Sequence, residues 1–354
     1  MIPYMKYITV FICAIYGTYG CSSCRPKSKI QETVYLETHV YADKGFPAVY
    51  NKHENETETL TKAYLVSFWN SVELRFSNLY FPLRLPLVGI TFLNDSEDNQ
   101  IFQGMNNNKA DANATIIKFK QFLHSGAQRP TADLVILLTS GFSVCCYDLN
   151  VSDSDELFTA WGLPPLYRRS LYLKSNSKEI EVSGASFIPK GVCTDYNIAM
   201  SIDQPGRHTG FLWAVRQLSK VIGARDDGKE GSQCPASGGH LMSHSDQMIN
   251  FNFFSPCSKE DMENHLLDVN KTNPSCWARN YSLQDVRQDE NLRGPGMAGE
   301  TLPLRTRCQA YFGDDKWSCR ERTETCKTTC CVQGAWYHFT WPAIGVLPTA
   351  DGQT

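Results

Sequence analysis

Apolar side chains recur along this chain at intervals that predict helices and strands in alternation. The helical segments place apolar residues three or four positions apart, and the strand segments are short apolar or β-branched runs. The expected helices cover residues 60–76, 110–124, 209–222 and 258–267, and the expected strands cover residues 33–36, 85–92, 133–139, 184–188 and 196–202. Alternation of this kind predicts an α/β domain in which helices pack on a sheet.

The helix predicted at residues 209–222 is clearly amphipathic. Its apolar face consists of Phe211, Val215, Leu218 and Ile222. Thr209 is expected to cap its amino-terminal end, because a threonine hydroxyl can accept a hydrogen bond from the first helical turn. Gly223 is expected to end the helix, since glycine adopts the left-handed backbone of a C-cap without strain.

Three charged residues lie close together at the end of this helix. Arg216 and Lys220 are four positions apart and share one flank, and Asp226 follows three residues after Gly223. Taken alone, this arrangement is typical of a capped surface helix whose charges are solvated. The surrounding sequence favours a different interpretation.

Four landmarks follow one another along the chain. Residues 215–228 (VRQLSKVIGARDDG) have the frame of the motif H-E-x-x-H-x-x-G-x-x-H, followed by Asp-Gly. The others are Gly191-Val192-Cys193-Thr194, Gly239-His240-Leu241-Met242-Ser243 and Phe254-Ser255-Pro256-Cys257-Ser258. On these motifs the mature chain resembles the reprolysin (adamalysin and ADAM-like) metalloproteases, most closely the secreted tick salivary ones.

The resemblance implies an α/β fold of the metzincin type: a mixed twisted sheet with packed helices, and a cleft above a Met-turn at Met242. A small disulfide-rich domain would follow. The resemblance also implies two disulfides, Cys193–Cys276 and Cys234–Cys257. Active members of the family hold a catalytic zinc ion and cut matrix and clotting proteins of the host.

The residues that would bind zinc and activate water are replaced in this chain. The three ligand positions hold Arg216, Lys220 and Asp226, and the general-base position holds Gln217. Arginine and lysine offer only N–H donors and positive charge, one carboxylate is too few for a zinc site, and an amide is no base near neutral pH. We therefore expect no intact catalytic or metal residue and no cofactor, with Asp226 paired to Arg216 or Lys220.

Three functional hypotheses remain open at this stage. The first is a secreted pseudoprotease that binds host extracellular or plasma proteins and modulates haemostasis or matrix. The second is an active secreted zinc endopeptidase with a site of another form, for which His240 and His244 beside Met242 are candidate ligands. The third is a protein retained as an antigenic decoy.

The strand predicted at residues 184–188 has two interpretations. It consists of Gly184, Ala185, Ser186, Phe187 and Ile188. By resemblance, this segment is the edge strand that pairs with a bound peptide, and such an edge can capture an extended peptide without catalysis. In the other interpretation Phe187 and Ile188 simply fill the core.

Residues 1–20 have the pattern of a secretory signal. Lys6 precedes an apolar run at residues 7–16, and small residues follow it. Six N-x-Ser/Thr sequons predict a glycoprotein, at Asn55, Asn94, Asn113, Asn150, Asn270 and Asn280. Fourteen cysteines fit an oxidising, extracellular location, and a net charge of −3 gives no reason to expect nucleic acid or a membrane as partner. We expect a secreted monomer.

The predicted organisation has three parts. Residues 1–20 are the signal peptide, residues 30–283 the protease-like domain and residues 294–354 a cysteine-rich region. No pro-segment separates the first two parts, which fits either an inactive protein or an incomplete sequence. The last part holds Cys308, Cys319, Cys326, Cys330 and Cys331. Five cysteines cannot all pair with one another, so either the chain is truncated or one thiol pairs elsewhere.

Overall fold

The computed structural model describes most of residues 28–276 and part of a small sheet near the C-terminus. The described residues are 28–48, 54–105, 108–125, 130–141, 169–175, 178–187, 189–205, 208–229, 232–243, 250–276, 322–324, 327–332 and 335–339. The predicted signal at residues 1–20, Ile188, His244 and the predicted domain boundaries at residues 283 and 294 lie outside them.

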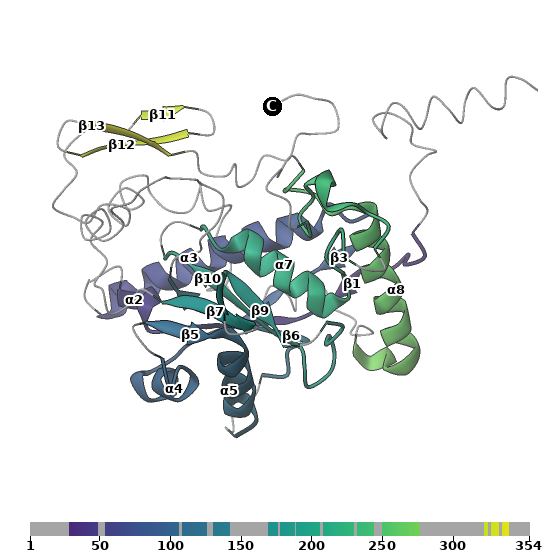
Figure 1. Ribbon diagram of the computed structural model, residues 1–354, viewed down its shortest axis with the longest axis horizontal. Coiled ribbons are helices and arrows are strands. Elements are labelled where there is room, and N and C mark those ends of the chain that lie inside the picture. Colours follow the sequence, from purple (N-terminus) through teal and green to yellow (C-terminus); the bar gives the residue numbers. More distant parts are fainter. Residues whose placement is uncertain are drawn as a thin grey trace, which may run out of the picture.

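A five-stranded sheet forms the centre of the fold (Figure 1). Its order is β4 (Leu87–Phe92), β2 (Thr38–Ala42), β6 (Leu134–Ser140), β10 (Ile198–Asp203) and β9 (Gly184–Ser186). The first four strands are parallel, whereas β9 runs antiparallel to β10 and pairs Ala185 with Met200. Every residue of β6 and β10 is buried, as expected for strands covered on both faces.

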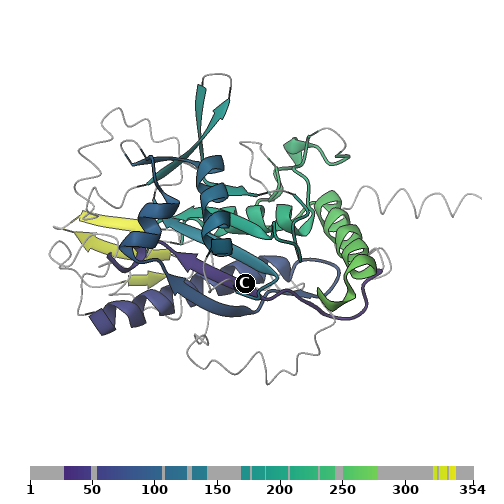
Figure 2. The ribbon, with the colours of Figure 1, turned by 90° about the horizontal axis from the view of Figure 1, so that it is seen from below.

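Helices cover both faces of this sheet (Figures 1 and 2). Helices α3 (Glu54–Phe76) and α7 (Phe211–Ile222) lie on one face, and α4 (Asp95–Ile101) and α5 (Ala112–Ser125) lie on the other. Side chains of β6 alternate between the two cores: Ile136 joins the α3 and α7 core, and Val135 joins the α5 core. The predicted α/β class is therefore confirmed.

Smaller elements surround the sheet. Strands β5 (Lys109–Asp111), β7 (Ser170–Ser175) and β8 (Lys178–Val182) form a second sheet, from which the β7–β8 hairpin projects (Figure 2). Helix α2 (Gly45–Ala48) precedes α3, and α8 (Pro256–Thr272) packs beside α7. Strands β11 (Arg322–Glu324), β12 (Lys327–Val332) and β13 (Ala335–Phe339) form a third sheet. Within the described ranges, no helix combines the length and apolarity needed to cross a membrane.

Several predicted boundaries are wrong. The segment expected as the first strand of the main sheet contains only β1 (Val34–Tyr35), which pairs with β3 (Leu83–Arg84); β2 enters the main sheet instead. The helix expected at residues 258–267 is the longer α8, and Ser255 caps it by accepting from the Ser258 amide. Pro256 explains the earlier start, because proline fits the first helical position, where its missing N–H costs nothing.

Candidate functional site

The amino-terminal end of α7 is fastened to the end of β10. Gly210, not Thr209, is the N-cap residue, and it offers no capping side chain. The Asp203 carboxylate takes that role, because it accepts from the Gly210 amide at 2.8 Å. Burial raises the pKa of Asp203 to about 7, although hydrogen bonds from Tyr64 and from the Gly210 and Gln204 amides oppose the shift.

The carboxy-terminal end of α7 reverses the chain at Gly223, as predicted. Gly223 has a φ of 124°, and its amide donates to the Ser219 and Lys220 carbonyls. The Ala224 amide also donates to the Ser219 carbonyl, at 2.8 Å. This tight turn sends the following residues back toward the flank of α7, where Asp226 becomes buried.

Arg216 and Asp226 meet in a buried ion pair. Arg216 Nη2 lies 3.0 Å from Asp226 Oδ1, and the two residues are 4% and 6% exposed. The same guanidinium donates to the Ser243 carbonyl at 2.9 Å and to the Met242 carbonyl at 3.3 Å. Arginine provides several donors in a rigid plane, so one side chain can bind the carboxylate and the turn backbone together.

Two lysines bind the other carboxylate oxygen of Asp226. Lys220 Nζ lies 3.1 Å and Lys229 Nζ 3.0 Å from Asp226 Oδ2. Burial lowers the pKa of Lys220, and the charges of Arg216 and Lys229 add to that effect, whereas Asp226 opposes it. Three cations therefore surround one carboxylate.

Met242 lies beneath this cluster. Its side chain is fully buried, and its carbonyl also accepts from the Asp227 amide at 3.0 Å. The Asp227 carboxylate in turn accepts from the Ser255 hydroxyl at 2.7 Å. The chain after α7 is thus tied both to the Met242 turn and to the start of α8.

The two disulfides hold the same region together. The structure joins Cys234 to Cys257 and Cys193 to Cys276, the pairs that the family resemblance implies. Cys234 lies next to the cluster, because its carbonyl accepts from the Gly228 amide at 2.8 Å. The Cys234–Cys257 disulfide therefore links the segment beside the Asp226 turn to the start of α8.

The residues at these positions do not fit a zinc ion. Both oxygens of Asp226 are already bound by cations, and Arg216 and Lys220 have no lone pair to donate to a metal. Gln217 is buried at the position that the family resemblance assigns to the general base, and its amide cannot accept a proton near neutral pH. These side chains therefore do not form a set of zinc ligands.

Strand β9 presents its outer edge beside α7. It ends the sheet order, so no strand in the described part of the chain pairs with its outer side. Phe187 donates its amide to Ile198, and Ile202 donates its amide to Ser183. Antiparallel ladders alternate, so the backbone groups of Gly184 and Ser186 face away from β10. A β-carbon at Gly184 would lie 3.0 Å from Gln217 Cγ, so one face of β9 packs against α7.

Aromatic residues follow the same edge. Phe187 is half-buried against the α5 core, and its ring centroid lies 5.3 Å from that of the exposed Tyr196. Lys120 Nζ lies 3.5 Å from the Tyr196 ring centroid and 4.8 Å from that of Phe187. Phe187 thus fills core in part and in part lines the surface next to β9.

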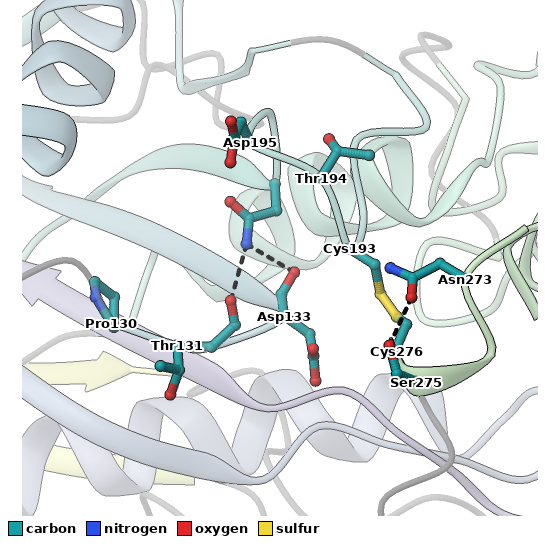
Figure 3. Close-up of a pocket in the computed structure, with 11 residues that line it drawn as sticks. Pro130, Thr131, Asp133, Cys193, Thr194, Asp195, Asn273, Ser275 and Cys276 are labelled. Carbon is teal, nitrogen blue, oxygen red and sulfur yellow. Dashed lines mark hydrogen bonds between the residues drawn. A yellow bond between two sulfur atoms is a disulfide. The ribbon is translucent and has the colours of Figure 1, made fainter.

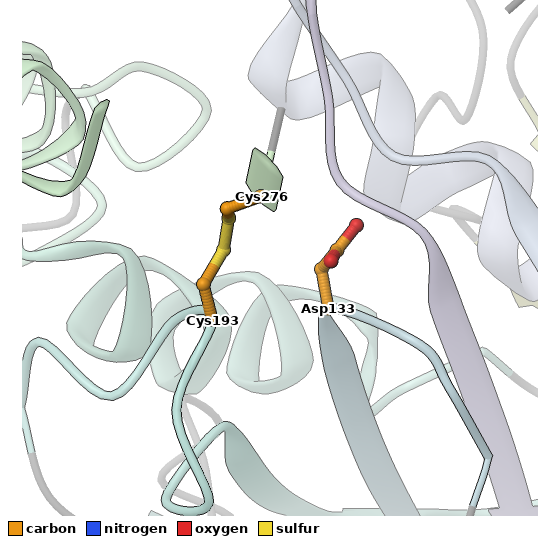
Figure 4. A group of neighbouring side chains, drawn as sticks. All are labelled: Asp133, Cys193 and Cys276. Carbon is orange, nitrogen blue, oxygen red and sulfur yellow. A yellow bond between two sulfur atoms is a disulfide. The ribbon is translucent and has the colours of Figure 1, made fainter. Parts of the chain in front are cut away.

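A pocket of about 450 Å³ lies near the Cys193–Cys276 disulfide (Figure 3). Asn197 is one of the residues that line it and donates to the Ala132 and Asp133 carbonyls. Figure 4 shows Asp133 beside the two bonded sulfur atoms, and within the described ranges these three residues are the one group with metal-ligand types at close range. Disulfide sulfurs are not thiolate ligands, so this group offers a metal only one carboxylate.

Sequence reasoning missed part of the cluster. Lys229 could have been inferred, because it follows Asp226 by three residues. The Met242 and Ser243 carbonyls carried no sequence signal, since every residue has a carbonyl. His240 is half-buried, and the structure does not bring it into a group of three possible ligands within the described ranges.

Comparison with known proteins gives one distant relative. No family model matches the chain. The chain is 21% identical over 346 residues to a protein of Bombyx mori described as "A disintegrin and metalloproteinase with thrombospondin motifs like". The match covers 93% of this chain but only 44% of that protein. At this level of identity the chain is similar to part of a metalloproteinase-related protein.

Proposed function

We propose that this protein is an extracellular, catalytically inactive homologue of the reprolysin-type metalloproteases that captures extended segments of other proteins along β9. One observation carries the proposal: the Asp226 carboxylate is bound by Arg216 and Lys220, at 3.0 and 3.1 Å, at the positions where the family has zinc ligands. A site that is filled by cations cannot polarise a carbonyl or lower the pKa of water by metal binding.

The architecture around the cluster supports a metzincin-type scaffold. The sheet is parallel except for its antiparallel edge strand β9, and α7 follows β10 directly. The buried Met242 lies under the end of α7, as a Met-turn would. The distant similarity to a metalloproteinase-related protein agrees with this assignment.

The outer edge of β9 supplies the binding function. An extended segment that pairs with β9 would bond the outward backbone groups of Gly184 and Ser186, because sheet edges recognise peptides through the main chain. No bond needs to be cut for such capture. The disulfides fit an extracellular location, and we propose extracellular proteins, including host plasma proteins, as the partners.

The loss of catalysis is tested on the full chain secreted from eukaryotic cells. Zinc content is measured by mass spectrometry, and casein cleavage is measured with and without a chelator. We expect far less than one zinc per chain and no cleavage above the background of mock-purified medium. About one zinc per chain, together with chelator-sensitive cleavage, would establish the active zinc endopeptidase instead.

The binding half of the proposal is tested with proline at the edge. Ser186→Pro removes an outward amide and leaves the ladder to β10 intact, so captured segments should dissociate. Ser186→Ala is the matched control, because it keeps the amide and removes only the hydroxyl. Binding of extended peptides that survives Ser186→Pro would exclude capture at this edge.

A further inference from the structure

The cluster beside β9 has an excess of positive charge. Arg216, Lys220 and Lys229 all contact the single carboxylate of Asp226. The neighbouring Asp227 accepts from the Ser255 hydroxyl and also feels the charge of Arg216, but with Asp227 included only two carboxylates face the three cations. The cluster is therefore cationic even after its internal pairing.

The two lysines are the accessible members. The side chains of Lys220 and Lys229 are 21% and 64% exposed, whereas that of Arg216 is 5% exposed. Each ammonium group has three N–H donors, and Asp226 Oδ2 accepts from only one on each. Both lysines therefore retain donors for an incoming oxygen ligand.

The position of Lys220 brings these donors next to the edge strand. The α-hydrogen side of Gly184 faces Gln217, since a β-carbon added there would lie 3.0 Å from Gln217 Cγ, and Lys220 follows Gln217 by three residues, so both lie on the same side of α7. Side chains of a bound extended segment alternate between the two faces of the sheet. Every second side chain of a segment on β9 would therefore point to the α7 face, toward Lys220.

We infer that the edge of β9 selects extended segments that carry an aspartate or glutamate side chain, with Lys220 and Lys229 as the donors to that carboxylate. The inference rests on the proposed capture by β9 and adds the chemistry of the captured segment. It is an argument from charge complementarity: a carboxylate would supply the negative charge that Asp226 alone does not. It would also oppose the effect of burial and of neighbouring cations on the pKa of Lys220.

The test measures fluorescence anisotropy of labelled extended peptides with the full secreted chain. The peptides share one neutral sequence and differ at a central position, which is glutamate, glutamine or lysine. We expect the glutamate peptide to bind at least about tenfold more tightly than the glutamine peptide, as a charge-assisted hydrogen bond allows. The lysine peptide should bind most weakly, and added salt should reduce the difference.

Variants assign the selectivity to the lysines. In Lys220→Gln/Lys229→Gln the preference for glutamate should fall below about twofold, with the glutamine peptide unaffected. Arg225→Gln is the control, because Arg225 is an exposed cation near the cluster whose ion pair is with Asp261. It should leave the preference unchanged.

The outcomes separate this inference from the function on which it rests. Equal binding of the three peptides, or a preference that survives in the lysine variant, overturns the acidic selectivity while capture by β9 stands. Loss of all binding in Ser186→Pro, but not in Ser186→Ala, supports capture. If no peptide binds the unmodified chain, both the capture and the selectivity are overturned.

Discussion

The Arg216 guanidinium and the Asp226 carboxylate form a buried ion pair across the Gly223 turn, with Nη2 and Oδ1 3.0 Å apart. The buried Arg216 charge needs the Asp226 carboxylate beside it, because an uncompensated buried ion costs several kcal/mol. In the proposed function Arg216 and Asp226 stand at positions of zinc ligands, and their opposite charges offset each other. The pair joins the chain after α7 to the Met242 turn, because Arg216 binds both Asp226 and the Met242 carbonyl.

Removal of the Asp226 charge should lower the stability of the protein. Asp226→Asn leaves Arg216 buried without a counter-ion, and we expect it to lower the free energy of unfolding by about 3 kcal/mol. The matched control is Asp261→Asn, which breaks the exposed pair with Arg225 and should cost at most about 1 kcal/mol. Urea titrations give both values.

A double-mutant cycle adds a second check on this pair. Arg216→Met combined with Asp226→Leu should cost less than the sum of the two single substitutions, because the buried guanidinium that Asp226→Leu alone would leave without a counter-ion is also removed. Strict additivity would mean that the two groups do not stabilise each other.

The turn at Gly223 should tolerate no side chain. Its φ is 124°, and a β-carbon there would lie 2.6 Å from His265 Cβ. Gly223→Ala should therefore cost more than the roughly 1–2 kcal/mol of backbone strain alone. Gly104→Ala isolates that strain, since Gly104 has a φ of 84° and a β-carbon there would meet nothing within 4 Å. In thermal unfolding, Gly223→Ala should lose more stability than Gly104→Ala. Equal losses of stability would mean that His265 does not lie against Gly223.

Acid should release the N-terminal segment from α8. The Glu263 carboxylate accepts from Ser28, from the Lys29 and Ile30 amides and from the Tyr80 hydroxyl. Burial tends to raise the pKa of Glu263, but these hydrogen bonds outweigh it and hold the pKa below its usual value. Because the folded pKa is the lower one, this contribution to stability is complete above the usual pKa and disappears as the pH falls through the folded value.

The corresponding measurement is the free energy of unfolding at a series of pH values. The unmodified chain should exceed Glu263→Gln in stability near neutral pH, and the gap should close as the pH falls below the usual pKa of glutamate and through the lower folded value. A gap that stays constant over this range would show that ionisation of Glu263 contributes nothing to the fold.

Strong local signals explain which elements could be predicted from the sequence. Helix α7 is predictable because its apolar residues recur every three or four positions and a glycine follows. Strand β6 is predictable because its apolar run is unbroken, as befits a strand buried on both faces. Both signals come from burial, because buried positions are apolar and their spacing can be seen in the sequence.

Elements without a buried face have no such pattern of apolar residues. Strand β8 was missed because its residues are almost all exposed and include lysine and glutamate, so cross-strand pairing with β7 holds it in place. The same limit applies to the site. The pairing of Arg216 with Asp226 could be anticipated from charge and spacing, whereas its bonds to the Met242 and Ser243 carbonyls depend on how the chain folds back.

The proposed function requires that α7, the Gly223 turn and the Met242 turn form an intact zinc-site scaffold in which only the ligands have been replaced. The most direct test restores them together, with Arg216→His, Gln217→Glu, Lys220→His and Asp226→His in the full secreted chain, and measures zinc by mass spectrometry. A variant that keeps Asp226 and Lys220 while carrying the other two changes serves as the control. We expect about one zinc per chain in the restored protein and far less in the control. A folded restored protein that binds no zinc would contradict this claim.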